Sequence, residues 1–159
     1  MREADIAIRF HKPQQLDLIQ RKLFTVHFHL YASPMYLDEH GTPSKISDLK
    51  NHKIVTYGRA PDYLKEINWL ENITQEYKIK PILKIGNIKG LHMAVSNSIG
   101  IAMLPDYLVS QDDNLVRIAF NAKLPEIDTY LTYAEERRNS KRIAVFREFI
   151  IEIGKEWAF

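Results

Sequence analysis

The sequence predicts an α/β protein in which short strands alternate with helices. Three observations lead to this class. The chain has 159 residues, 45% of them hydrophobic, which is enough for one ordinary domain or two small lobes with a packed core. Short apolar runs rich in β-branched residues recur between segments that carry helix-capping residues. Residues 140–159 change to the apolar period of an amphipathic helix.

Two strands are expected near the N-terminus. Residues 4–10, "ADIAIRF", suit a buried strand, and residues 11–22 are expected to form a polar loop. Residues 23–33, "LFTVHFHLYAS", alternate in polarity over the length of a long strand. The predicted apolar face holds Phe24, Val26, Phe28 and Leu30, and the opposite face holds Thr25, His27, His29 and Tyr31.

A short helix with clear boundaries is predicted next. Ser33 is the expected N-cap, Pro34 fits the first helical position, and Gly41 ends the helix. One more helical turn is expected around Ser47, and "KIVTYG", residues 53–58, is predicted to be a strand.

The middle of the chain is less uniform. Residues 59–80 leave two possibilities open, a helical excursion or two irregular strands. A strand at 82–86, a helix at 87–97 and a strand at 99–105 are predicted after it, followed by a helical turn at 105–111.

The C-terminal part is predicted to hold two strands and a helix. The strands are residues 114–120 and 129–136, with a proline-containing loop between them, and the helix begins at Ser140. Its apolar stripe consists of Ile143, Phe146, Ile150, Ile153 and Trp157, widened by Phe149.

Composition excludes several classes of protein. The net charge is +2, from 22 basic and 20 acidic residues, which is too balanced to indicate a nucleic-acid surface. The absence of cysteine excludes disulfides and thiolate metal sites. No signal peptide and no apolar run of membrane-spanning length is visible, so we expect a cytoplasmic protein without a membrane partner.

Five segments in a fixed order carry a resemblance to a known family. They are "EADIAIRF", "LYASPMYLDEHGTPSKISDLKNHKIVTYG", "GNIKGLHMAVSNSIGIAMLPDYLV", "NLVRI" and "SKRIAVFREFIIEIG". Together they resemble the effector-binding, or substrate-binding, domain of LysR-type bacterial transcriptional regulators. The most specific pieces are "ASPMYLDEHGTP" with the following "DLKNH", and "AVSNSIGIAMLP".

The resemblance implies a type II periplasmic-binding-protein-like α/β fold, with one complete lobe and a partial second lobe joined by two crossover strands. Residues 1–33 would be a remnant of the first lobe and the outgoing crossover strand. Residues 34–125 would be the complete second lobe. Residues 126–159 would be the return strand and a C-terminal helix that packs on the first lobe.

The resemblance also implies what lies outside this sequence. The family's winged helix-turn-helix and the first strands and helices of its effector domain have no counterpart here, so the chain resembles an N-terminally truncated regulator. DNA would be bound only through the absent winged-helix domain. The apolar stripe of the last helix would lack its cover, and we therefore expect a homodimer or an exchanged oligomer.

The implied function is the sensing of a small, anionic, carboxylate-bearing effector in a cleft between the lobes. The helix start at Asn87, Ile88 and Lys89 would supply unpaired amides and a positive charge. Four further ligand-binding candidates are Tyr57, Gly58, Ser33 and Arg9. The alternative for this helix start is that Asn87 is an ordinary N-cap and Lys89 is simply solvated.

No enzyme is predicted. His27 and His29 share a strand face and could form a metal pair, but no third ligand is placed by spacing, so no metal site and no cofactor are expected. No acid–base or nucleophile set is recognisable, and no catalytic residue is assigned. A solute-binding protein of a transport system, which has the same lobe architecture, is the alternative function.

Overall fold

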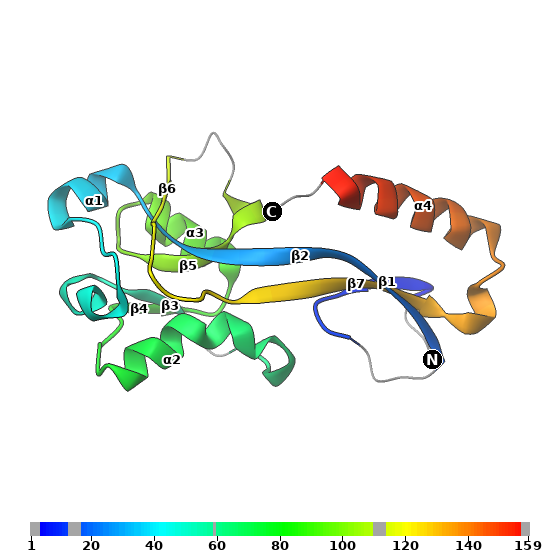
Figure 1. Ribbon diagram of the computed structural model, residues 1–159, viewed down its shortest axis with the longest axis horizontal. Coiled ribbons are helices and arrows are strands. Elements are labelled where there is room, and N and C mark those ends of the chain that lie inside the picture. Colours follow the sequence, from blue (N-terminus) through cyan, green and yellow to red (C-terminus); the bar gives the residue numbers. More distant parts are fainter. Residues whose placement is uncertain (1–3, 13–16, 59, 110–113, 157–159) are drawn as a thin grey trace. The chain divides into compact units, whose positions relative to one another are not determined.

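The computed structural model describes residues 4–12, 17–58, 60–109 and 114–156 (Figure 1). The chain divides into two compact units. Unit 1 combines residues 1–26 with 127–159, and unit 2 is residues 27–126. The strands β2 (Leu18–Ala32) and β7 (Glu126–Ala134) each contribute residues to both units.

Unit 1 is a small antiparallel sheet with one long helix. Strand β1 (Ile6–Arg9) pairs with β7, and Ile6 lies opposite Tyr133. A 3₁₀ turn, η4 (Glu135–Arg137), leads from β7 to helix α4 (Lys141–Glu156). Strand β2 begins at Leu18, so the loop predicted for residues 11–22 is wrong in its second half, where residues 18–22 belong to the sheet.

Helix α4 buries only part of its predicted apolar stripe. Ile143 and Ile150 are buried, whereas Phe146 is 42% and Phe149 57% exposed. Trp157 lies outside the described residues. Val145, which is 69% exposed, adds to the uncovered apolar surface of this helix. The helix therefore presents apolar side chains on both its buried and its exposed sides.

Unit 2 is built on a mixed sheet. Strand β5 (Ala102–Pro105) pairs antiparallel with β2, placing Phe28 opposite Pro105, and the short β6 (Val116–Arg117) pairs with β2 as well. Strands β3 (Val55–Tyr57) and β4 (Leu83–Ile85) pair in parallel. A parallel bridge between Ile54 and Ile101 connects this pair to β5.

Helices cover both faces of the β3–β4 pair. Helix α3 (Ile88–Ser96) packs Leu91 and Val95 against Val55 of β3. Helix α2 (Trp69–Glu76) contacts β3 from the other face, where Thr56 bonds to Glu71. The consecutive residues Val55 and Thr56 thus face different helices, as the pleat of a strand requires.

The remaining helical segments are short. They are α1 (Pro34–His40), η1 (Ile46–Asn51), η2 (Asp62–Asn68) and η3 (Asp106–Leu108). Of the two possibilities for residues 59–80, the structure adopts the helical one in η2 and α2. The predicted strand at 114–120 keeps only the two residues of β6 in the sheet.

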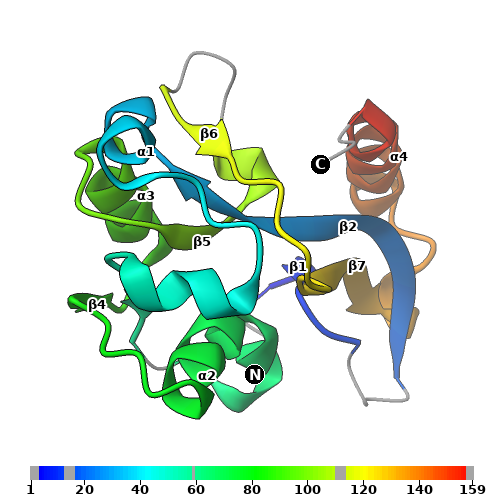
Figure 2. The same cartoon turned by 60° about the vertical axis from the view of Figure 1, so that its left-hand side comes forward.

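The predicted boundaries of α1 are confirmed, and its start is tied to α3. The Ser33 hydroxyl accepts a hydrogen bond from the Tyr36 N–H at 3.1 Å, and Gly41 ends the helix with a positive φ of 79°. Ser98, just after α3, also has a positive φ, 59°. Its hydroxyl lies 2.7 Å from that of Ser33, so α1 and α3 lie side by side in unit 2 (Figure 2).

Within the described residues, no helix combines the length and the apolar character needed to cross a lipid bilayer.

Candidate functional site

Helix α3 begins at a tight turn after β4. Asn87 is its N-cap, and the Asn87 side-chain oxygen accepts a hydrogen bond from the Gly90 N–H at 2.6 Å. The Leu91 N–H donates to the Asn87 carbonyl at 3.2 Å. The first amides of an α-helix have no partner within the helix. The amides of Ile88 and Lys89 are therefore the ones this geometry leaves for solvent or a ligand.

Gly90 serves packing within the chain rather than access for a ligand. A Cβ atom at this position would lie 2.6 Å from Ile85 Cγ2 and 3.1 Å from Asn87 Oδ1. Glycine is thus required because the first turn of α3 lies directly on the end of β4. The small size of Gly90 is therefore explained by packing within the chain. Gly86 does have open space, since nothing lies within 4 Å of a Cβ built there.

The structure brings the ends of β3 and β4 together beside this turn. The Gly58 N–H donates to the Ile85 carbonyl at 3.3 Å, and a Cβ on Gly58 would lie 3.9 Å from Gly86 Cα. Tyr57 and Ile88 are partly buried against the hydrophobic cluster around Leu91. Five of the seven predicted residues therefore belong to one corner of unit 2: Tyr57, Gly58, Asn87, Ile88 and Lys89.

This corner has a positive electrostatic character. The start of a helix carries a partial positive charge, and Lys89 adds a full one. The first turn of α3 contains no acidic residue. Lys89 is exposed, so its ammonium group can reach a ligand bound at the free amides.

The other two predicted residues do not join this group. Ser33 contacts Ser98, which follows the C-terminal end of α3, whereas Asn87 caps its N-terminal end. The nine residues of α3 separate the two ends by about 14 Å at the helical rise. Arg9 belongs to unit 1, where it lies opposite Tyr130 in the β1–β7 pair.

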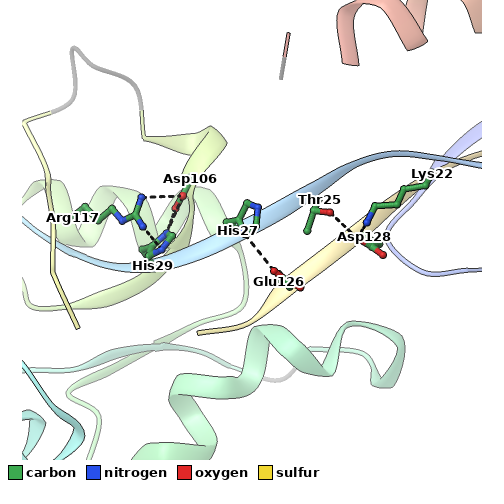
Figure 3. A network of polar contacts seen from close by, with 8 residues as sticks. All are labelled: Lys22, Thr25, His27, His29, Asp106, Arg117, Glu126 and Asp128. Atoms are coloured by element: carbon green, nitrogen blue, oxygen red, sulfur yellow. Dashed lines mark hydrogen bonds and ion pairs between the residues drawn. The ribbon is translucent and has the colours of Figure 1, made fainter. Parts of the chain in front are cut away.

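The polar face of β2 holds contacts that the sequence did not reveal (Figure 3). In unit 2, His27 Nδ1 lies 3.6 Å from Glu126, and His29 Nδ1 lies 2.7 Å from Asp106. In unit 1, Thr25 donates to Asp128 at 2.8 Å. The predicted division of β2 into two faces is confirmed for Val26, Phe28 and Leu30, which are buried. Neither histidine needs a metal to explain its position, and the described residues contain no group of three or more suitable ligands.

His29 lies between Asp106 and Arg117 in this network. The Arg117 guanidinium bonds to Nε2 of His29, and a guanidinium can only donate. Nε2 must then be the acceptor, so Nδ1 carries the proton and donates to Asp106. Tyr31 also donates to Asp106, at 3.0 Å. Burial and the Asp106 carboxylate raise the pKa of Tyr31 far above its ordinary value, which keeps its hydroxyl protonated.

The architecture of unit 2, a mixed sheet between helices, together with two strands that run on into a second unit, defines the class of protein as type II periplasmic-binding-protein-like. Within this class, the sequence identifies the family. The LysR substrate binding domain family matches residues 1–154, and the chain belongs to this family.

Individual relatives agree with the family. An HTH-type transcriptional regulator of Haemophilus influenzae is 29% identical over 140 residues, 84% of this chain and 47% of its own length. The HTH-type transcriptional regulator CrgA of Neisseria meningitidis is 28% identical over 155 residues, 95% of this chain and 52% of its own length. The chain thus spans about half the length of the curated relatives it matches.

Solved structures give the same result. The regulatory domain of CrgA superposes with a TM-score of 0.74 at 26% identity, covering 95% of this chain and 76% of that domain. The regulatory domain of CcmR from Synechocystis PCC6803, solved in complex with 2-PG, has a TM-score of 0.71 at 12% identity, a similarity of fold alone; it covers 98% of this chain and 76% of that one. CrgA and the Haemophilus influenzae relative are transcriptional regulators, which are not enzymes, and the transport alternative is not favoured.

Proposed function

We propose that the chain senses a small carboxylate-bearing effector for a LysR-family regulator, in the cytoplasm, and that the effector binds at the start of α3. The observation that best supports this is the open backbone at Gly86, next to the free amides of Ile88 and Lys89. A helix start of this kind suits a carboxylate because its amides donate and its partial charge is positive. The 2-PG complex of the CcmR regulatory domain supports a small-molecule role for this fold.

An effector acts on a regulator only through unequal affinity for two conformations. We infer that the ligand favours one arrangement of the chain, and that this arrangement is passed on to a winged-helix domain that binds DNA and lies outside this sequence. Ser33 and Arg9 would contact an effector at the start of α3 only in a different conformation of the chain.

The first test is a calorimetric titration with a panel of small carboxylates. Lys89→Ala should weaken the binding of a hit by about five- to thirtyfold, since a charged hydrogen bond is worth about 1–2 kcal/mol. Lys80→Ala removes an exposed lysine just before β4 and should leave the affinity unchanged. Equal affinities of the wild type and Lys89→Ala would exclude Lys89 from the site.

We further propose that the exposed apolar side of α4 is covered by a second copy of the chain, as a homodimer or an exchanged oligomer. Val145, Phe146 and Phe149 support this, because each large apolar side chain gains about 1.5–3 kcal/mol on burial. Light scattering at micromolar concentration should give at least twice the monomer mass of 18.6 kDa. Phe149→Glu should shift this mass towards the monomer, whereas Glu148→Gln should not; a monomeric wild type would refute the proposal.

A further inference from the structure

A hollow in unit 2 lies apart from the proposed effector site. Its volume is about 770 Å³, and it lies between β2 and the segment that joins β6 to β7. The Ile118 N–H donates to the Leu30 carbonyl at 2.9 Å, and the Phe28 N–H donates to the Pro125 carbonyl at 3.3 Å. Residues 119–124 leave the edge of β2 between these two bonds and return to it, and the hollow opens beneath them.

The wall of this hollow is held by bonds of its own. The Asn121 N–H donates to the Ser44 carbonyl at 2.7 Å, which fixes residues 119–124 to the segment before η1. The Ala122 N–H donates to the Phe120 carbonyl at 3.0 Å and closes a tight turn within it. Ile118, at its base, is 1% exposed. The cavity is thus bounded by constrained backbone and does not depend on a loose loop.

The lining is polar on one side, where Arg117 supplies a positive charge, and apolar on the other. Arg117, His27 and His29 line it, and no aspartate or glutamate is among the lining residues. The side chain of Arg117 is 58% and that of His27 45% exposed, so both can reach a bound molecule. The apolar part is supplied by Phe28, Phe120, Leu124 and Pro125.

The contacts with His29 and Asp106 hold the Arg117 side chain in a position where it can bind an anion. Two of its contacts, to His29 Nε2 and, at 3.8 Å, to Asp106, fix the position of the guanidinium at the rim (Figure 3). A guanidinium has five N–H donors, and these two contacts do not use them all. The remaining donors can form the paired bonds that a carboxylate accepts.

We propose that this hollow is a second ligand site, specific for a small organic anion that has an aromatic or branched aliphatic body. Arg117 and His27 bind the carboxylate, and the phenylalanine side of the cavity receives the apolar body. The site is independent of the corner at α3, because Asn87 and Lys89 are not among its lining residues.

The experiment is a titration of the isotope-labelled chain with benzoate, followed by the backbone amide resonances. Saturable shifts are expected in residues 118–125, and acetate, which has the charge without the ring, should bind at least about tenfold more weakly. Arg117→Gln should weaken benzoate binding about tenfold or more. Lys123→Gln, which removes a cation from the same segment but not from the lining, should change the affinity less than about twofold.

Each contrary outcome is decisive. Equal benzoate affinity in the wild type and Arg117→Gln overturns the proposal, and so does the absence of saturable shifts in residues 118–125 of the wild type. The second outcome does not depend on whether the Arg117 variant folds. Shifts confined to residues 86–90 overturn this site and leave the effector site at α3 standing, so the two proposals fail separately.

Discussion

Gly100→Ala is expected to lower the free energy of unfolding by at least about 3 kcal/mol. Gly100 is buried, and a Cβ atom there would lie 2.3 Å from the carbonyl oxygen of Lys53 and 2.9 Å from its carbonyl carbon. These are backbone atoms, which cannot rotate away as a side chain can. The same carbonyl accepts a hydrogen bond from the Ile101 N–H at 2.9 Å, so any shift also damages the bridge between Ile54 and Ile101 that connects β3 to β5.

The measurement is urea unfolding followed by circular dichroism, with Gly86→Ala as the matched control. A Cβ on Gly86 meets nothing within 4 Å, so that variant should differ from the wild type by less than about 0.5 kcal/mol. A Gly100→Ala protein as stable as the control would mean that Lys53 and Gly100 do not approach each other as described.

Local signals in the sequence predicted the elements well because those signals act over a few residues. Ser33 begins α1 and Gly41 ends it through their own backbone geometry and capping bonds. Asn87 caps α3 in the same way. Residues 18–22 are predicted to lie in a loop because the segment 11–22 is polar as a whole, although Leu18 and Ile19 are apolar. They are strand residues in the structure because the neighbouring chain, and not their own polarity, keeps them in the sheet.

The contacts of the candidate sites were less accessible to sequence analysis. His29 and Asp106 are 77 residues apart, and His29 and Arg117 are 88 apart, so no spacing rule links them. The close approach of Gly58 to Gly86 follows from the parallel pairing of β3 with β4, which only the fold establishes. Asp106 gave one usable signal, because it directly follows the strand that ends at Pro105. Polar residues that follow strands in an α/β sheet gather at one edge.

Glu71→Gln is expected to destabilise the chain by about 2–3 kcal/mol at neutral pH. Glu71 is 6% exposed and binds three partners. The Thr56 hydroxyl donates to it at 2.6 Å, the Gln75 amide donates at 3.0 Å, and the Lys84 ammonium forms an ion pair with it. These contacts join α2 to both β3 and β4. A neutral amide cannot accept all three bonds, because its NH2 group would replace one oxygen and face either the Thr56 hydroxyl or the Lys84 ammonium.

The loss should depend on pH, which separates the charge of Glu71 from its shape. Burial opposes ionisation, but the bonds from Lys84, Thr56 and Gln75 outweigh it, and the pKa of Glu71 is lowered. A carboxylate with a lowered pKa stabilises the folded state above its unfolded pKa of about 4.3, and this stabilisation disappears as the pH falls through the folded value. The wild type should therefore lose its advantage over Glu71→Gln progressively as the pH falls below about 5, as measured by urea unfolding at each pH.

An exposed glutamate on the same helix provides the control for this prediction. Glu76→Gln should be within about 0.5 kcal/mol of the wild type at every pH, because its side chain is solvated. If the difference between the wild type and Glu71→Gln stayed constant from neutral to acidic pH, the ion pair with Lys84 would not be what stabilises this part of unit 2. Shape alone would then account for the loss, since a constant difference means that the proton has no linkage to folding at this position.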